Sequence, residues 1–415
     1  MVARSLQLMA VALTGDRRVD IDDVPAVTAD TDPLRERGLS ILRRAAIAVW
    51  AVVVVFRTWT TGFAFNRELL LIYICTGLIA ASIGRRRVLQ VIRDWLPFAL
   101  ILVVYDLSRG AATLIGTSTL WQTQPRIDRW LFFGAEPTVW LQEHFKLPDP
   151  PWWEVVISSI YMSFFVLPYV VAGVLWLRSR DDWKAFTRRF LALSFIALVC
   201  YAIVPAAPPW AAARCTPAQV AGGPSEPACM FASPAGVPDG GLLGPMDTSR
   251  PGAGDFVERI STRGWGKLHL EAARALVDEG QASVNLVAAI PSLHAALTAM
   301  IAAFLWRRIQ SRWRPLLAAY VVVMAFTLVY SAEHYVFDIL LGWALALTVH
   351  AGMNRLEARR SRARDEPVRE DSRPVELEPL QLTTAAAPLP CRTPTSPGPT
   401  SASDGRPPGG DENSW

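Results

Sequence analysis

The sequence predicts an all-α fold, a polytopic membrane helical bundle with about eight transmembrane helices. Apolar residues make up 52% of the 415-residue chain, and the mean hydropathy of +0.25 is too high for an ordinary soluble protein. The chain also contains 16 tryptophans, whose amphipathic rings favour the membrane–water boundary. The formal net charge of only +4 does not indicate nucleic-acid binding.

A helix crosses a bilayer with about 20 predominantly apolar residues. Eight segments of the sequence approach this requirement, and the first is the weakest of them because Arg57 interrupts it. In chain order, these expected spans are residues 45–65, 69–84, 95–116, 153–177, 190–208, 287–306, 316–331 and 336–353. Together with their connections, they would form one transmembrane domain over residues 41–355.

Arginine-rich clusters predict the orientation of the bundle. They lie before the first span, in three short connections and after the last span, at residues 35–44, 85–87, 178–189, 307–314 and 355–364. With eight spans, all of these clusters fall on one side, and the positive-inside rule makes that side cytoplasmic. We therefore expect a multi-pass protein of the cell membrane with both termini in the cytoplasm. Two long connections, residues 117–152 and 209–286, would be extracytoplasmic.

The regions outside the spans have compositions of their own. We expect residues 1–40 and 356–415 to be disordered cytoplasmic tails; the second is rich in Pro, Ser, Thr, Gly and Asp and cannot bury a core. The second long connection contains Cys215 and Cys229. Outside the cytoplasm a disulfide between these two cysteines is permitted.

Two short stretches contain the candidate catalytic residues: PSLH at 291–294 and EHYVFD at 333–338. Ionisable side chains at membrane depth are costly, so they indicate function. Residues four apart share a helical face, so Asp338 can orient one ring nitrogen of His334 and leave the other to attack phosphorus. His294 would then protonate the leaving alkoxide. The pattern favours phosphoryl transfer without a metal; the structural alternative is two interfacial histidines hydrogen-bonded to the backbone.

Further candidates would bind the phosphate or the substrate. Asp106 and Arg109 are three apart in the third span, next to Tyr105, and both must face the bundle interior. Arg109 is the first choice for a phosphate clamp, because a planar guanidinium can hold two phosphate oxygens. The alternative is an Asp–Arg pair that locks two helices. Arg129 of the first long connection would line the substrate entrance or belong to a solvated turn, and Ser292 lies within the PSLH stretch.

These stretches resemble the type-2 phosphatidic acid phosphatase superfamily. The PSLH stretch is similar to the second signature of that family, whose histidine protonates the leaving group. His334 and Asp338 are similar to the nucleophilic histidine and carboxylate of the third signature. The third signature usually begins with Ser-Arg, whereas the corresponding Thr327-Leu328 has no arginine, and the basic first signature is not recognisable.

The departures point to one branch of the superfamily. Together with the EHY triplet at 333–335, residues 105–109 and the PPW triplet at 208–210, they resemble inositol phosphorylceramide synthases and related inositolphosphotransferase-like proteins. The resemblance covers roughly residues 85–353. It implies a six-helix phosphatidic-acid-phosphatase-like core, a phosphohistidine intermediate on His334, and no required metal. No Cys/His cluster has zinc spacing and no Gly-rich loop precedes a lysine, so we expect no cofactor.

The favoured function is a lipid phosphotransferase that acts at the extracytoplasmic face. Its partners would be membrane lipids and a small-molecule or lipid acceptor, with no nucleic acid. A lipid-phosphate or polyprenyl-diphosphate phosphatase is the first alternative, since water can replace the acceptor. A lipid transporter or flippase with Asp106 and Arg109 on the substrate path is a second alternative. A catalytically inactive scaffold is a third.

Overall fold

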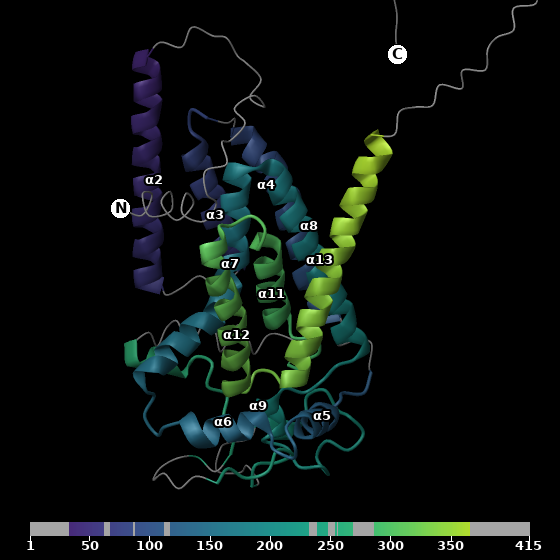
Figure 1. The fold of residues 1–415 in the computed structure, drawn as a ribbon. Helices are drawn as coiled ribbons and strands as arrows, with labels where there is room; N and C mark the ends of the chain where they lie inside the picture. The colour runs from purple at the N-terminus through teal and green to yellow at the C-terminus, as the bar shows by residue number, and fades with distance from the viewer. Residues whose placement is uncertain are drawn as a thin grey trace, which may run out of the picture. The chain divides into compact units, whose positions relative to one another are not determined.

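The computed structural model (Figure 1) describes residues 33–61, 67–85, 88–111, 117–231, 239–247, 254, 256–268 and 286–365. Within these ranges the chain is helical and contains isolated bridges but no strand, which confirms the all-α prediction. Backbone contacts divide the chain into a unit that ends at Ser361 and a C-terminal unit, Arg362–Trp415. The greater part of both expected tails lies outside the described residues.

Each expected span overlaps a helix in the described part of the chain. These helices are α2 (Pro33–Thr61), α3 (Arg67–Ser82), α4 (Val88–Ala111), α7 (Trp152–Arg178), α8 (Arg180–Ile203), α11 (Leu293–Leu305), α12 (Arg314–Tyr330) and α13 (Val336–Asp365). Five of these helices, α2, α7, α8, α12 and α13, contain or belong to segments long and apolar enough to cross a membrane. A multi-pass membrane protein is therefore supported, while the count of eight spans and the six-helix core stay predictions. Both α2 and α13 extend into an expected tail.

The segment expected to span the membrane at 287–306 forms a shorter helix. It begins at Leu293 and has 13 residues, a rise of about 20 Å against the roughly 30 Å of a hydrocarbon core. The preceding residues instead pair with the extended backbone that follows α8. Ala206 N–H donates to the Val287 carbonyl at 2.6 Å, and Ala289 N–H donates to the Ala206 carbonyl at 3.2 Å. This pairing satisfies backbone groups that a longer helix would have used.

The core of the bundle surrounds α11, which contacts α7, α8 and α12. Large apolar side chains fill the space between these helices and are almost fully removed from solvent. They include Trp176, Phe186, Leu193, Phe304 and Leu328. Because interiors of this kind are close-packed, the axis of α11 is held on several sides.

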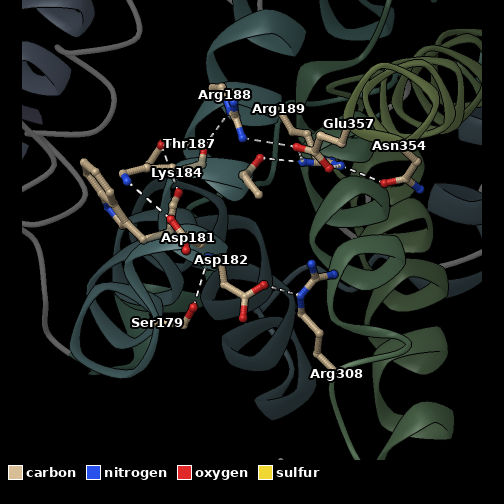
Figure 2. A network of polar contacts seen from close by, with 12 residues as sticks. Ser179, Asp181, Asp182, Lys184, Thr187, Arg188, Arg189, Arg308, Asn354 and Glu357 are labelled. Atoms are coloured by element: carbon tan, nitrogen blue, oxygen red, sulfur yellow. Dashed lines mark hydrogen bonds and ion pairs between the residues drawn. The ribbon is translucent and has the colours of Figure 1, made fainter. Parts of the chain in front are cut away.

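A charged network fixes the end of α13 that lies far from its first turn (Figure 2). The Arg189 guanidinium, 1% exposed, donates to both Glu357 oxygens at 2.9 and 2.6 Å and to Asn354 Oδ1 at 2.7 Å. Arg308, just after α11, donates to Asp182 Oδ1 at 2.9 Å. At 1.5 Å per residue, Glu357 lies roughly 30 Å along α13 from the start of that helix, a distance comparable to the bilayer core.

The long connections fold into a cap beside the turn between α12 and α13 (Figure 1). Its short helices are α5 (Thr123–Leu131), α6 (Pro137–Phe145), α9 (Pro209–Ala212), η3 (Ala228–Phe231) and η5 (Arg263–Leu268); η6 (Ser311–Trp313) precedes α12. The cap contains a disulfide between Cys215 and Cys229, the pairing that the sequence permits. Tyr335 of the turn is fully buried in the apolar cluster of the cap, with Trp210 and Val257.

Candidate active site

His294 lies in the first turn of α11, where a capped helix start fixes its backbone. Ser292 is the N-cap, and its Oγ accepts a hydrogen bond from Ala295 N–H at 3.3 Å. The Ser292 backbone N–H donates to the Asp338 carbonyl at 3.0 Å. This bond joins the start of α11 to the start of α13. The two sequence stretches are therefore held against each other through their backbones.

His334 lies in a tight, buried turn between α12 and α13. The backbone N–H groups of Glu333 and His334 both donate to the Leu328 carbonyl, at 3.0 and 3.3 Å. Ala332 adopts a positive φ of 61°, a left-handed conformation that non-glycine residues rarely adopt. The surrounding contacts must hold this conformation, because the left-handed region costs about 1–3 kcal/mol for such a residue.

Asp338 faces the His334 ring from the first turn of α13. Its Oδ2 lies 3.6 Å from His334 Nδ1 and accepts the Tyr335 N–H at 3.1 Å. The His334–Asp338 contact is longer than an ordinary hydrogen bond, so it orients the ring mainly by charge. His334 is 6% exposed and Asp338 is fully buried, so the pair lies in a low-dielectric site where such interactions are strong.

The two histidines are in direct contact. His334 Nε2 lies 3.4 Å from His294 Nδ1. The His294 ring also lies against Phe164, with centroids 3.9 Å apart, and stacks on Tyr161 at 5.0 Å. In the tautomer whose Nδ1–H points to Asp338, the Nε2 atom of His334 keeps its lone pair. That lone pair faces the ring of His294.

A second carboxylate supports the start of α13; the sequence places it in the first long connection, at the substrate entrance or in a solvated turn, and gives no sign of this role. Asp128 of α5 is fully buried and accepts the backbone N–H groups of Val336 and Phe337 at 2.8 and 2.9 Å. Burial raises the pKa of Asp128 to about 6; these two hydrogen bonds lower it and the Asp338 charge raises it. A negative charge at a helix N-terminus also complements the helix dipole. Asp128 therefore holds the turn that presents His334.

A partly buried ion pair lies directly beside His334. Arg259 Nε and Nη2 donate to the two carboxylate oxygens of Glu333 at 2.8 and 3.0 Å. The Arg259 guanidinium also lies over the Trp210 ring, 5.1 Å from its centroid. Burial alone raises the pKa of Glu333, but the charge and hydrogen bonds of Arg259 outweigh burial and hold that pKa below its ordinary value. No sequence pattern pointed to Arg259, which lies in the second long connection.

The other predicted site residues lie elsewhere or outside the described part. Tyr105 is 2% exposed and packs edge-on against Phe195 of α8, and Asp106 is half-buried on the same helix. The Arg109 side chain lies outside the described residues. Arg129 donates to the Leu242 and Leu243 carbonyls at 2.9 and 3.3 Å, a contact that ties α5 to the second long connection. A role in substrate binding for these residues stays a prediction.

The cluster brings two imidazoles and a carboxylate together. His334 Nε2 can attack an electrophilic phosphorus, His294 can carry a proton to a leaving oxygen, and Asp338 can stabilise the positive charge on His334. Across the described residues, no group of three or more His, Cys, Asp or Glu side chains is arranged to hold a metal ion. Two imidazoles and a carboxylate are groups suited to acid–base and nucleophilic chemistry.

Fold and site together define a helical membrane protein with a His–His–Asp cluster at one end of its bundle. Residues 125–352 match the PAP2 superfamily, which is more than half of the 415-residue chain. The chain therefore belongs to the PAP2 superfamily. Members of this superfamily are phosphatases or phosphotransferases, which supports an enzyme acting on lipid phosphates. Neither the curated proteins nor the solved structures contain a match to the chain.

Proposed function

We propose that this protein is an integral-membrane lipid phosphotransferase that acts at the extracytoplasmic face through a phosphohistidine on His334. The observation that carries the proposal is the cluster of three side chains from two motifs. His334 Nε2 lies 3.4 Å from His294 Nδ1, and His334 Nδ1 lies 3.6 Å from Asp338 Oδ2. A nucleophile, an acid and an orienting carboxylate are thus assembled at one buried point.

The proposed reaction has two balanced steps. In the first, the His334 Nε2 lone pair forms a bond to phosphorus, the bond between phosphorus and the leaving alkoxide breaks, and His294 gives its proton to that oxygen. In the second, an acceptor hydroxyl attacks phosphorus, the N–P bond breaks, and His294 takes the hydroxyl proton. Asp338 stabilises the cationic phosphohistidine in between. One residue acts as acid and then as base, as microscopic reversibility requires.

An apolar groove supports a lipid as the donor. The groove has a volume of about 560 Å³ and opens between α6, α12 and α13. Its lining is almost entirely apolar, and it includes Val336 and Ile339 in the first turns of α13. Val336 is two residues from His334 in the sequence. A hydrocarbon chain in the groove would therefore place a phosphate headgroup near the histidines.

The disulfide supports an extracytoplasmic site. Cys215 and Cys229 lie in the cap, and Tyr335 of the catalytic turn belongs to the same apolar cluster as both cysteines. Disulfides persist mainly in oxidising compartments outside the cytoplasm. The positions of the arginine clusters in the sequence point to the same orientation.

The choice between an alcohol and water as acceptor separates the proposal from its main alternative. A lipid-phosphate or polyprenyl-diphosphate phosphatase would use the same first step and release the phosphate to water. The transferase is favoured by the resemblance of the EHY triplet and the PPW triplet to inositolphosphotransferase-like proteins. The two readings differ only in the product.

Purified protein in liposomes tests the proposal. Labelled phosphatidylinositol is the donor with ceramide as the acceptor, and a polyprenyl diphosphate is assayed in parallel. A new phospholipid that requires the acceptor and is lost in His334→Ala supports a transferase. Inositol phosphate released from phosphatidylinositol, or free phosphate released from the polyprenyl diphosphate, without an acceptor product and lost in this variant, supports the phosphatase. Exposed His144 of α6 gives the control His144→Ala, which should stay active. Full turnover by His334→Ala on every substrate would refute the mechanism.

A further inference from the structure

Phosphoryl transfer needs positive charge at the transferred group. Negative charge spreads over the phosphate oxygens in the transition state, and fixed cations stabilise it. The sequence reasoning placed Arg109 in this role, but its side chain lies outside the described residues. Among the described residues, Arg259 is an arginine whose contacts reach both histidines through one neighbour each, Glu333 for His334 and Tyr161 for His294.

The backbone beside Arg259 is tied to the end of α12, which lies next to His334. Gln142 of α6 makes this connection. It exchanges two hydrogen bonds with Glu258, the residue before Arg259: its Nε2 donates to the Glu258 carbonyl at 2.8 Å, and its Oε1 accepts Glu258 N–H at 3.0 Å. The same Nε2 donates to the Tyr330 carbonyl at the end of α12, at 2.8 Å. One buried amide thus fixes the loop of Arg259 against the turn of His334.

The guanidinium lies between the neighbours of the two histidines. Its Nε and Nη2 groups donate to the two carboxylate oxygens of Glu333, the residue before His334. Tyr161 interacts with both Arg259 and Glu333, and Tyr161 is also the residue whose ring stacks on His294 at 5.0 Å. Arg259 is 26% exposed, whereas Glu333 is 7% exposed, so a ligand can reach the guanidinium more easily than the carboxylate.

We propose that Arg259 is the phosphate-binding cation of the site, and that Glu333 occupies its fork until the substrate phosphate enters. The inference rests on the proposed function and adds a residue to it. A carboxylate and a phosphate present the same pair of oxygens to a guanidinium, so one can replace the other without moving the arginine. Trp210 keeps the guanidinium plane in place during the exchange through its cation–π contact. No covalent bond changes in this step.

A purely structural ion pair would behave differently, and variants distinguish the two roles. Breaking a structural pair from either side should have similar effects. For a phosphate-binding arginine, Arg259→Gln should lower kcat/KM by about 10²–10³-fold, in the range found for removing one transition-state donor. Arg259→Lys should recover only part of this, because an ammonium cannot bind two oxygens side by side. Glu333→Gln removes the competing carboxylate, so it should lower the inhibition constant of inorganic phosphate several-fold.

The matched control is another arginine of the same connection. Arg263 pairs with buried Glu154, with Nε and Oε2 3.1 Å apart. Arg263→Gln should lower the melting temperature and leave the inhibition constant of phosphate within about two-fold, as expected for a residue that makes no contact with the ligand. This comparison separates loss of phosphate binding from loss of loop anchoring.

The deciding experiment measures protection by inorganic phosphate in a background without turnover. The full-length His334→Ala protein should show a phosphate-dependent rise in melting temperature, and Arg259→Gln/His334→Ala should lose it, whereas Arg263→Gln/His334→Ala should keep it. Equal protection with and without Arg259 would overturn the role, as would equal kcat/KM losses in Arg259→Gln and Glu333→Gln. Failure of the proposed mechanism itself would appear separately, as turnover that survives His334→Ala.

Discussion

Replacing Asp128 with asparagine tests whether a carboxylate from the cap positions the proposed nucleophile. Asp128 accepts the N–H groups of Val336 and Phe337, which begin the helix just after His334. Asparagine keeps the shape but has a single accepting oxygen, and its amide group then faces the second backbone N–H. Losing one charge-assisted hydrogen bond of this kind costs about 1.5–3 kcal/mol.

The buried charge of Asp128 has an opposing cost, which asparagine removes. Burial raises the pKa of Asp128 from 3.8 to about 6, and at 1.36 kcal/mol per pKa unit this difference corresponds to about 3 kcal/mol at neutral pH. This difference already includes the effect of the two hydrogen bonds on the charged form, so we expect Asp128→Asn to melt no lower than the wild type at pH 7. Turnover should fall roughly 10–100-fold, because a displacement of about 1 Å at the reacting groups can cost 10²-fold.

The pH dependence of stability follows from the direction of this pKa change. The folded-state pKa of Asp128 lies above its unfolded value, so its stabilising contribution is complete below about pH 4 and is lost as the pH rises through about 6. Relative to Asp128→Asn, the wild type should therefore lose stability from pH 4 to pH 7. The other titratable groups around this carboxylate are Glu136, Asp338, Arg129 and Tyr335. Burial raises the pKa of Glu136 to about 7. Because Glu136 is present in the wild type and in Asp128→Asn, most of its effect on stability cancels in the comparison.

Thermal melting by tryptophan fluorescence between pH 4 and 8, together with turnover at pH 7, tests this reasoning. Glu143→Gln is the control, because Glu143 Oε1 accepts the Asp247 N–H at 2.8 Å in an exposed part of the cap. Its turnover should stay unchanged. Full turnover by Asp128→Asn at pH 7 would refute a positioning role for Asp128. A loss of turnover that matches the loss of folded protein would also refute it.

Three further predictions concern the disulfide, the groove and the charged network. Cys215 and Cys229 are buried, so protein taken from cells should be denatured first, and a thiol reagent should then label both cysteines only after reduction; labelling without reduction would contradict an oxidised pair. Ala325→Trp should fill the apolar groove and raise KM about 10-fold for a long-chain lipid but not for a short-chain ester. The loss of a few methylene contacts of about 0.8 kcal/mol each is enough for this change. Equal changes in KM for both substrates would show that the groove does not bind the lipid chain. Arg189→Ala should destabilise the protein by about 1.5–3 kcal/mol with kcat retained, because Asn354 and Glu357 lose their charged hydrogen bonds to a buried guanidinium while Arg188 still pairs with Glu357; a lower kcat at an unchanged melting temperature would contradict this.

The parts of the site that sequence reasoning assembled are those with local signals. His334 and Asp338 are one helical turn apart, and helical periodicity alone predicts that they meet. The partner histidine, His294, follows from a topology in which both stretches begin a helix on the same side of the membrane. The two cysteines lie in the same connection, so predicting that they can pair required only that this connection lie in an oxidising compartment.

The missing parts depend on contacts without a local signal. Asp128 lies 208 residues before the N–H group that it caps, and Arg259 lies 74 residues before Glu333. Both belong to irregular connections, where no periodicity relates one segment to another. Residues 287–290 were predicted to be helical because they are apolar. In the structure they are extended, because Val287 and Ala289 pair with Ala206. Tertiary hydrogen bonds decided these positions.

The two histidines are in contact, but their proposed roles are different. Substrates with different leaving groups can distinguish these roles. In-line attack needs His334 Nε2 about 3–3.5 Å from phosphorus and the acid about 2.6–3.2 Å from an oxygen on the far side. A donor that approaches the leaving oxygen from beyond phosphorus lies farther from His334 Nε2 than the 3.4 Å that now separates this atom from His294 Nδ1, so we expect an entering phosphate to separate the rings.

An aryl phosphate with a weakly basic leaving group needs no acid, so His294→Ala should still phosphorylate His334 from it within about 10-fold of the wild type. The same variant should lose about 10²–10⁴-fold on an alkyl ester, which needs a proton. His334→Ala should lose both reactions. Equal losses on both esters in His294→Ala would mean that His294 holds the phosphate or the ring of His334 rather than delivering a proton.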